Sequence, residues 1–158
     1  MADSLNQDRI DTLAPTNHIT LESPPADKRA CIEYLLDLLV DAGRVENRET
    51  ALQALLAREE ETTTGVGMGI GIPHAQTDAV TQPSVAFARS DDGIDFGAMD
   101  DKPASLIFMI LVPESGADDH LAILSTLSRA LMHDEVRDDL YDAETPGDVQ
   151  DVLKEAVA

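Results

Sequence analysis

The sequence predicts a single α/β domain, in which a mixed β-sheet is flanked by α-helices on both faces. The chain has 158 residues, enough for one compact domain with a sizeable core. Strand-like and helix-like periodicities alternate along it, which is typical of an α/β domain. The run ASLIFMILV at 104–112 is apolar throughout, as in a central strand covered on both faces. We expect the domain to span 15–158 after a flexible polar segment at 1–14.

The first half of the chain predicts one short strand and two helices. Residues 18–23, HITLES, alternate apolar and polar positions as a strand does. From Ala26, apolar residues recur at steps of three and four until Gly43, which predicts an amphipathic helix with a glycine stop. The same spacing predicts a second helix from roughly Asn47 to Glu60.

The second half predicts the rest of the sheet and three closing helices. Strands are expected at 84–89, 93–96 and 104–112, and helices at 118–132, 134–142 and 146–156. The helix at 118–132 has a broad apolar face, expected to be formed by Leu121, Ile123, Leu124, Leu127 and Leu131.

The charge balance is the most unusual bulk property of the chain. It has 31 acidic residues against 11 basic ones, a formal net charge of −20. Such a surface disfavours nucleic-acid binding because it repels the phosphate backbone. An acidic, lysine-poor surface is typical of proteins from halophilic microbes, where concentrated salt screens the self-repulsion. We therefore expect a halophilic origin and no nucleic-acid partner.

Cysteine usage and hydropathy indicate a soluble, cytoplasmic protein without membrane insertion. The single cysteine, Cys31, excludes an internal disulfide and a multi-cysteine metal site, and its apolar helical setting predicts a buried thiol. The longest apolar run, at 106–112, is far shorter than the ~20 residues that span a bilayer. The N-terminus lacks the basic and apolar pattern of an export signal.

Four histidines are the candidates for chemistry. His18 begins the predicted strand and His133 ends a predicted helix, so we interpret both as structural or exposed. His74 and His120 have settings that leave a functional role open.

His74 closes the glycine-rich stretch GVGMGIGIPH at 65–74. Pro73 fixes the approach of the backbone, and the glycines let the segment pass close to other chains or to a ligand. The stretch lacks the lysine-serine pair of a nucleotide-binding loop, so nucleotide binding is excluded. A loop histidine in this setting is either reactive or inert, and the spacing alone favours an inert residue.

His120 lies in the first turn of the predicted helix at 118–132, with Asp118 or Asp119 as the expected N-cap. A helix start attracts anions, which favours a role at a charged ligand. His120 also shares a face with apolar residues, and the alternative is a half-buried histidine hydrogen-bonded at the helix start.

Two motifs carry a family resemblance. GIGIPH at 69–74 is followed, in this order, by PESGADDHLAILSTLSRAL at 113–131. Over about residues 16–157 the chain resembles the fructose/mannitol-type (type 2) enzyme IIA domain of the phosphoenolpyruvate-dependent sugar phosphotransferase system (PTS).

The resemblance implies a phosphocarrier. His74 would accept a phosphoryl group from the phosphorylated histidine-containing phosphocarrier protein and pass it to a cysteine of enzyme IIB, with the membrane enzyme IIC downstream. The sugar implied is fructose. His120 would be the second active-site imidazole, and Arg58 of the L-x-R-E element would support the site. No cofactor and no metal are implied.

The residue types suit this chemistry independently of the family. A neutral imidazole is nucleophilic near pH 7 and forms a phosphoramidate reactive enough to be handed onward. His120, its helix start and Arg58 would balance charge on the equatorial oxygens without a metal. Thr63 or Thr64 would hydrogen-bond one imidazole and fix its tautomer, or would simply be turn residues.

Three points stay open at this stage. Many members of the family have a small residue and then a basic one after I-P-H, whereas this chain has Ala75 and Gln76, which leaves open whether a cationic contact exists here. The alternative function is a nitrogen-type IIA regulatory module, in which the phosphorylation state of His74 controls binding to a partner protein. A metal site that joins His74 and His120 is a third reading, disfavoured because no tight ligand spacing is present.

Overall fold

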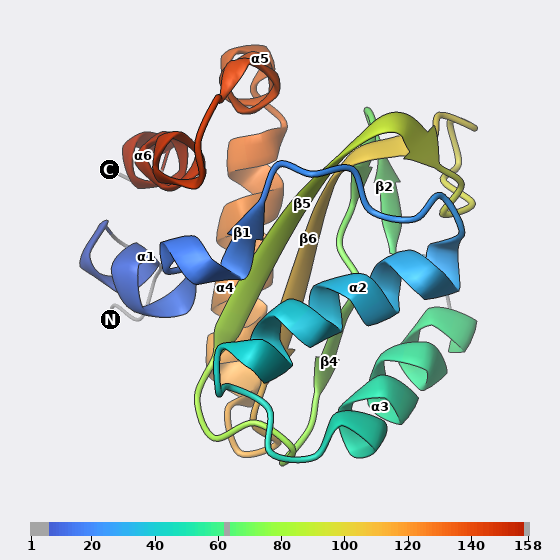
Figure 1. Cartoon of the computed structure of the whole chain (residues 1–158), viewed down its shortest axis with the longest axis vertical. Helices are drawn as coiled ribbons and strands as arrows, with labels where there is room; N and C mark the ends of the chain where they lie inside the picture. The colour runs from blue at the N-terminus through green and yellow to red at the C-terminus, as the bar shows by residue number, and fades with distance from the viewer. Residues whose placement is uncertain (1–6, 62–63, 157–158) are drawn as a thin grey trace.

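The computed structural model describes residues 7–61 and 64–156, and within them the chain forms one mixed six-stranded sheet between two helical layers (Figure 1). The strands are β1 (Ile19–Thr20), β2 (Gly65–Gly67), β3 (Ile70–Gly71), β4 (His74–Gln76), β5 (Ser84–Ile94) and β6 (Ala104–Val112). The helices are α1 (Gln7–Leu13), α2 (Lys28–Asp41), α3 (Arg48–Glu61), α4 (Ala117–Leu131), α5 (Asp134–Asp142) and α6 (Pro146–Ala156), with a 3-10 turn η1 at Thr16–His18.

Strand β6 is the centre of the sheet, as its unbroken apolar run predicts. The strand order is β1-β5-β6-β3-β2, and β4 also pairs with β6. The β5–β6 pair is antiparallel, whereas β3 and β4 run parallel to β6, which makes the sheet mixed. Alternate side chains of a strand point to opposite faces, so Phe108 and Met109 belong to different core clusters. Each large apolar side chain buried in this way contributes about 1.5–3 kcal/mol to stability.

Helices cover both faces of the sheet, which confirms the predicted fold class. One core cluster joins α2 and α3 to the sheet, and the other joins α4, α5, α6 and α1 to the opposite face (Figure 1). Residues 7–13, which lie in the segment expected to be flexible, form α1 and bury Ile10 and Leu13 in the second cluster. No helix within 7–61 and 64–156 is long and apolar enough to cross a membrane.

The two helices of the first half lie close to their predicted positions, and side-chain caps fix where they begin. Asp27 accepts a hydrogen bond from the Ala30 amide at 3.0 Å in front of α2. Asn47 accepts one from the Thr50 amide at 3.1 Å in front of α3. The bounds of α5 and α6 are those that the sequence predicts.

Four local predictions are wrong. Helix α4 begins at Ala117 with Gly116 as its N-cap, so neither Asp118 nor Asp119 caps it. Leu121 is 68% exposed because the buried face of α4 runs through Ile123, Leu127 and Leu131.

The expected strand at 18–23 is only Ile19–Thr20, since His18 already belongs to η1. The expected strands at 84–89 and 93–96 form one strand, β5, whose register against β6 shifts between Arg89 and Ile94.

Candidate functional site

His74 is the first residue of β4, so its placement in a loop is wrong. The chain leaves β3, passes Pro73 and joins β6 again in parallel, with His74 opposite Ile110. The Ile110 amide donates to the Pro73 carbonyl at 3.0 Å, which fixes the backbone just before the histidine. The side chain of His74 is only 7% exposed. Pairing of β4 with the central strand β6 therefore holds this imidazole at the surface of the core.

The tautomer of His74 is set by the backbone carbonyl of Ile72, two residues earlier in the chain. Nδ1 lies 2.6 Å from the carbonyl oxygen of Ile72. A carbonyl oxygen only accepts, so Nδ1 carries the hydrogen and donates it. In the neutral ring the lone pair is then on Nε2, which is the nitrogen left for chemistry.

His120 lies beside His74, although the two residues are far apart in the sequence. It is the fourth residue of α4, and its amide donates to the Gly116 carbonyl at 2.9 Å. The two ring centroids are 5.2 Å apart with an interplanar angle of 58°. The Nε2 atom of His120 is buried and has no hydrogen-bond partner in the described part of the chain. A buried polar atom of this kind needs a partner, which a bound anion would supply.

Arg58 opens onto the same region from α3. A hollow of about 330 Å³ separates α3 from the start of α4. It is lined by Ala54, Ala57, Arg58, Glu61, Ala75, Gln76 and His120. The structure thus brings together Arg58 and His120, and it places Gln76, which stands where the family pattern has a basic residue, on the wall of the hollow.

Both imidazoles are kept neutral by their surroundings. Burial lowers the pKa of His74, and Arg58 lowers it further, while the bond to the Ile72 carbonyl and the charge of Glu59 oppose these effects. Burial also lowers the pKa of His120, with further lowering from His74 and Arg58. A neutral His74 is a nucleophile at neutral pH, because its free nitrogen is not protonated.

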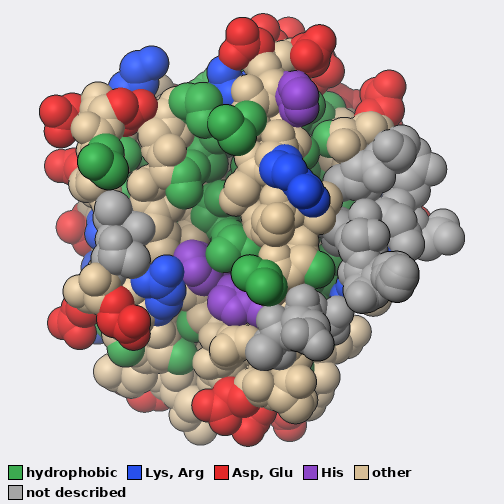
Figure 2. Space-filling model, turned by 180° about the vertical axis from the view of Figure 1, so that it is seen from behind, with side chains coloured by type: hydrophobic (Ala, Val, Ile, Leu, Met, Phe, Trp, Pro, Cys, Tyr) green, Lys and Arg blue, Asp and Glu red, His purple; other side chains and the backbone are tan. Residues whose placement is uncertain are grey.

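Basic and hydrophobic side chains lie next to two histidines on one face of the molecule. Figure 2 shows two adjacent histidine side chains near the middle of the face, with a basic side chain beside them and hydrophobic side chains above. Acidic side chains gather mainly towards the edges.

Thr64 does not make the hydrogen bond to an imidazole that the sequence proposed for Thr63 or Thr64. Thr63 lies outside the described residues. Thr64 is buried, and both its amide and its hydroxyl donate to Glu59, at 3.0 and 2.6 Å. For Thr64 the proposed direct bond is therefore wrong, because the carboxylate takes its hydroxyl hydrogen and a backbone carbonyl sets the histidine tautomer.

The remaining histidines and the cysteine have structural settings. His18 is fully buried, and its Nδ1 lies 3.0 Å from the Val85 carbonyl. His133 is exposed and is the N-cap residue of α5. Cys31 is buried in α2, as predicted, and burial raises the pKa of its thiol to about 12.

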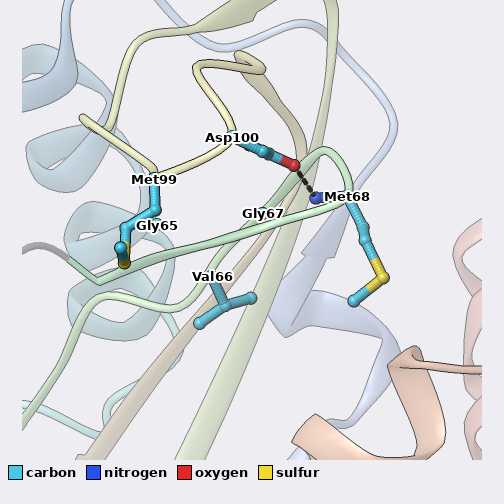
Figure 3. Close-up of a pocket in the computed structure, with 6 residues that line it drawn as sticks. All are labelled: Gly65, Val66, Gly67, Met68, Met99 and Asp100. Atoms are coloured by element: carbon cyan, nitrogen blue, oxygen red, sulfur yellow. Dashed lines mark hydrogen bonds between the residues drawn. The ribbon is translucent and has the colours of Figure 1, made fainter.

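The glycine-rich stretch packs against protein rather than forming a cradle for a ligand. A Cβ on Gly65 would lie 2.9 Å from Cβ of Phe96, so the close approach requires glycine there. A second hollow, about 290 Å³ in volume, lies beside β2 and the following turn (Figure 3). Its one charged lining group, Asp100, accepts a hydrogen bond from the Met68 amide at 2.8 Å. No histidine lines this hollow, and the carboxylate of Asp100 stabilises the turn at Met68.

The described side chains form no cluster of three or more His, Cys, Asp or Glu that would hold a metal ion.

Sequence reasoning missed two groups that act on His74, namely the Ile72 carbonyl and Glu59. The signal for Glu59 was its position next to Arg58 in the L-x-R-E element. The carbonyl has no sequence signal, because every residue has one.

Comparison with known proteins finds a matching family and a similar curated protein. Residues 12–156 match the family described as "Phosphoenolpyruvate-dependent sugar phosphotransferase system, EIIA 2". A curated relative from Haloferax volcanii, the "PTS system fructose-specific EIIA component", is 66% identical over 94% of this chain and 96% of its own length.

Solved structures share the fold over nearly the whole chain. The nitrogen regulatory protein IIA-Ntr from Neisseria meningitidis is 32% identical, with a TM-score of 0.81 over 92% of this chain and 99% of that one. The complex of enzyme IIA-mannitol with phosphorylated enzyme IIB-mannitol from Escherichia coli gives 28% identity and a TM-score of 0.76, over 88% of this chain and 95% of that one.

Proposed function

Because the chain belongs to the EIIA 2 family of the phosphoenolpyruvate-dependent sugar phosphotransferase system, we propose that it carries phosphoryl groups on His74 and passes them to a cysteine of enzyme IIB. One observation supports this most directly: His74 is a neutral, nearly buried imidazole whose Nδ1 hydrogen is held by the Ile72 carbonyl. The ring therefore presents one nucleophilic atom, Nε2, in a fixed direction.

The first step is uptake of the phosphoryl group. The Nε2 lone pair attacks phosphorus of the donor's phosphohistidine in line with the donor nitrogen. The new N–P bond forms as the donor's N–P bond breaks, and the electron pair of the broken bond returns to the donor ring. The Nδ1 hydrogen stays on His74, and the Ile72 carbonyl stabilises the positive charge that develops on the ring.

His120 and Arg58 balance charge on the three equatorial oxygens. The buried Nε2 of His120 lacks a partner in the described part of the chain, so a hydrogen on this nitrogen would be donated to a phosphoryl oxygen. The positive end of α4 and the Arg58 guanidinium add electrostatic support, and these groups supply it without a metal.

The second step reverses the chemistry towards sulfur. A thiolate of enzyme IIB attacks phosphorus, the S–P bond forms, and the electron pair of the N–P bond returns to Nε2 of His74. The IIA–IIB complex with which this chain shares its fold supports IIB as the acceptor. The donor is the phosphorylated histidine-containing phosphocarrier protein, and membrane enzyme IIC acts downstream of IIB. In this proposal the chain exchanges phosphoryl groups with these partners in the cytoplasm.

The sugar is fructose in this proposal, because the 66% identical relative is named as fructose-specific. That relative comes from a halophile, which agrees with the acidic composition of this chain. The alternative is a regulatory role like that named for IIA-Ntr, which is supported by a TM-score of 0.81 but by only 32% identity. The two roles share His74 and differ in whether phosphate passes to a IIB.

Incubation with enzyme I, the histidine phosphocarrier and phosphoenolpyruvate tests the proposal. We expect one acid-labile phosphate per chain, mapped to His74, and discharge when purified IIB is added. His74→Ala should stay folded and unlabelled. Labelling of His74→Ala at another residue would overturn the site, and a label on His74 that no fructose IIB discharges would favour the regulatory role.

A further inference from the structure

Glu59 is a nearly buried carboxylate to which the transfer steps above give no part. It follows Arg58 near the end of α3, and its side chain is only 7% exposed. A charge buried this deeply is tolerated only when it is paired and hydrogen-bonded. Lys28, the first residue of α2, places Nζ 2.7 Å from Oε2 of Glu59 and supplies the countercharge.

The same carboxylate holds Thr64 at two points. Oε1 accepts a hydrogen bond from the Thr64 hydroxyl at 2.6 Å, and Oε2 accepts one from the Thr64 amide at 3.0 Å. Thr64 is itself 3% exposed and stands immediately before β2. Glu59 therefore fixes both the backbone and the side chain of the residue that leads into the glycine-rich stretch.

Thr64 in turn holds the residue that orients His74. The Ile72 amide donates to the Thr64 carbonyl at 2.9 Å, and the Ile72 carbonyl accepts from Nδ1 of His74 at 2.6 Å. These two groups of Ile72 belong to adjacent peptide planes that meet at one Cα atom. A change in the position of Thr64 is therefore transmitted to the acceptor that selects the tautomer of His74.

We propose that Glu59 is a positioning residue for phosphoryl transfer, which fixes the tautomer and orientation of His74 through Thr64 and Ile72. This inference rests on the proposed function of His74. It assigns adjacent residues of α3 different tasks: Arg58 faces the phosphoryl group, whereas Glu59 acts on the nucleophile from behind through the backbone.

The charge of Glu59 has a second effect on the same ring. It raises the pKa of His74, against the lowering by burial and by Arg58. Loss of this charge therefore moves the pKa of His74 down. A residue that only stabilised the fold would leave both the tautomer and the titration of His74 unchanged.

The test compares Glu59→Gln with Glu60→Gln, a matched change at the next residue of α3, whose side chain is exposed. An amide offers one acceptor oxygen where the carboxylate accepts from three donors, so Glu59→Gln loosens the clamp. Nitrogen-15 NMR of the His74 ring reads the tautomer and the pKa without phosphate, and the initial rate of phosphate uptake is measured separately.

We expect the wild type and Glu60→Gln to show only the Nδ1–H tautomer. Glu59→Gln should show both tautomers, a lower pKa for His74 and an uptake rate reduced roughly tenfold, as is common for partners that orient a functional histidine. Thr64→Val removes the hydroxyl donor and should, like Glu59→Gln, show both tautomers of His74. Thr64→Ser keeps a hydroxyl and should show only the wild-type tautomer.

An unchanged tautomer and pKa in Glu59→Gln would overturn the inference, even if uptake were slower. Should Glu59→Gln fail to fold, Thr64→Val decides: an unchanged His74 tautomer in that variant also overturns it. If instead the wild type takes up no phosphate on His74, the proposed function fails. The tautomer measurement separates the two failures because it does not depend on phosphorylation.

Discussion

The rings of His74 and His120 lie 5.2 Å apart, with His74 on the short strand β4 and His120 in the first turn of helix α4. Burial lowers the pKa of both rings, and His74 lowers the pKa of His120 further. The pair therefore combines a nucleophile that is free to attack with a neighbour that meets the developing phosphoryl charge. The predictions below separate these two roles.

Replacement of His120 by alanine should slow phosphate uptake without loss of the fold. Removal of one group that stabilises transition-state charge typically costs about 10²–10³ in rate. The initial rate of phosphate uptake from the phosphorylated donor measures the effect, and circular dichroism checks the fold. His133→Ala serves as the control because His133 is exposed. Equal rates for wild type and His120→Ala would assign His120 a purely structural role.

Replacement of Arg58 by methionine should slow uptake and also move its pH dependence. Arg58 lowers the pKa of both histidines, so its loss raises both values. The uptake rate should then fall at a higher pH than in the wild type, as His74 becomes protonated earlier. Arg58→Lys keeps the charge and should keep the wild-type profile. NMR titration of both rings checks this, and identical titration curves in all three proteins would show that Arg58 does not act on the site.

The free energy of unfolding should decrease as the pH falls below about 6.5, the ordinary pKa of an unfolded histidine. Burial lowers the pKa of His18 in the folded state, and Arg44 adds to this, so the unfolded chain binds more protons in this range. His74 and His120 contribute with the same sign.

His18→Gln should be less stable at neutral pH but should lose less stability on acidification. Urea unfolding at about pH 7.5 and about pH 5.5, at constant salt, measures the difference. The assignment to His18 would be wrong if both proteins lost the same free energy between these two pH values.

Cys31 should be inert in the folded protein and irrelevant to transfer. Its pKa of about 12 leaves almost no thiolate at neutral pH, and the side chain is buried. Iodoacetamide should modify it only after denaturation, and Cys31→Ala should take up phosphate at the wild-type rate. Cys31→Ser should be destabilised by about 1–3 kcal/mol, because it places a hydroxyl in an apolar cluster. Rapid alkylation of the native protein would contradict the burial of this thiol.

Local patterns in the sequence predicted most of the fold. The apolar run of β6 was long enough to identify a strand buried on both faces, and the helical spacing predicted α2 and α3 close to where they lie. Errors occurred where packing against residues far away in the sequence decides whether a side chain is buried. The apolar spacing of α4 includes Leu121. Only the side of the helix that carries Ile123 and Leu127 is buried, so Leu121 stays exposed.

The candidate site divides in the same way. The sequence by itself determined the chemistry available, because I-P-H, the histidine in the first turn of a later helix and the arginine of L-x-R-E are visible as motifs. Only the tertiary structure decided how these groups work together. The pairing of β4 with β6 brings His74 to His120, and a backbone carbonyl selects the reactive nitrogen. Contacts of this kind join residues far apart in the chain or involve groups common to every residue, so no local pattern encodes them.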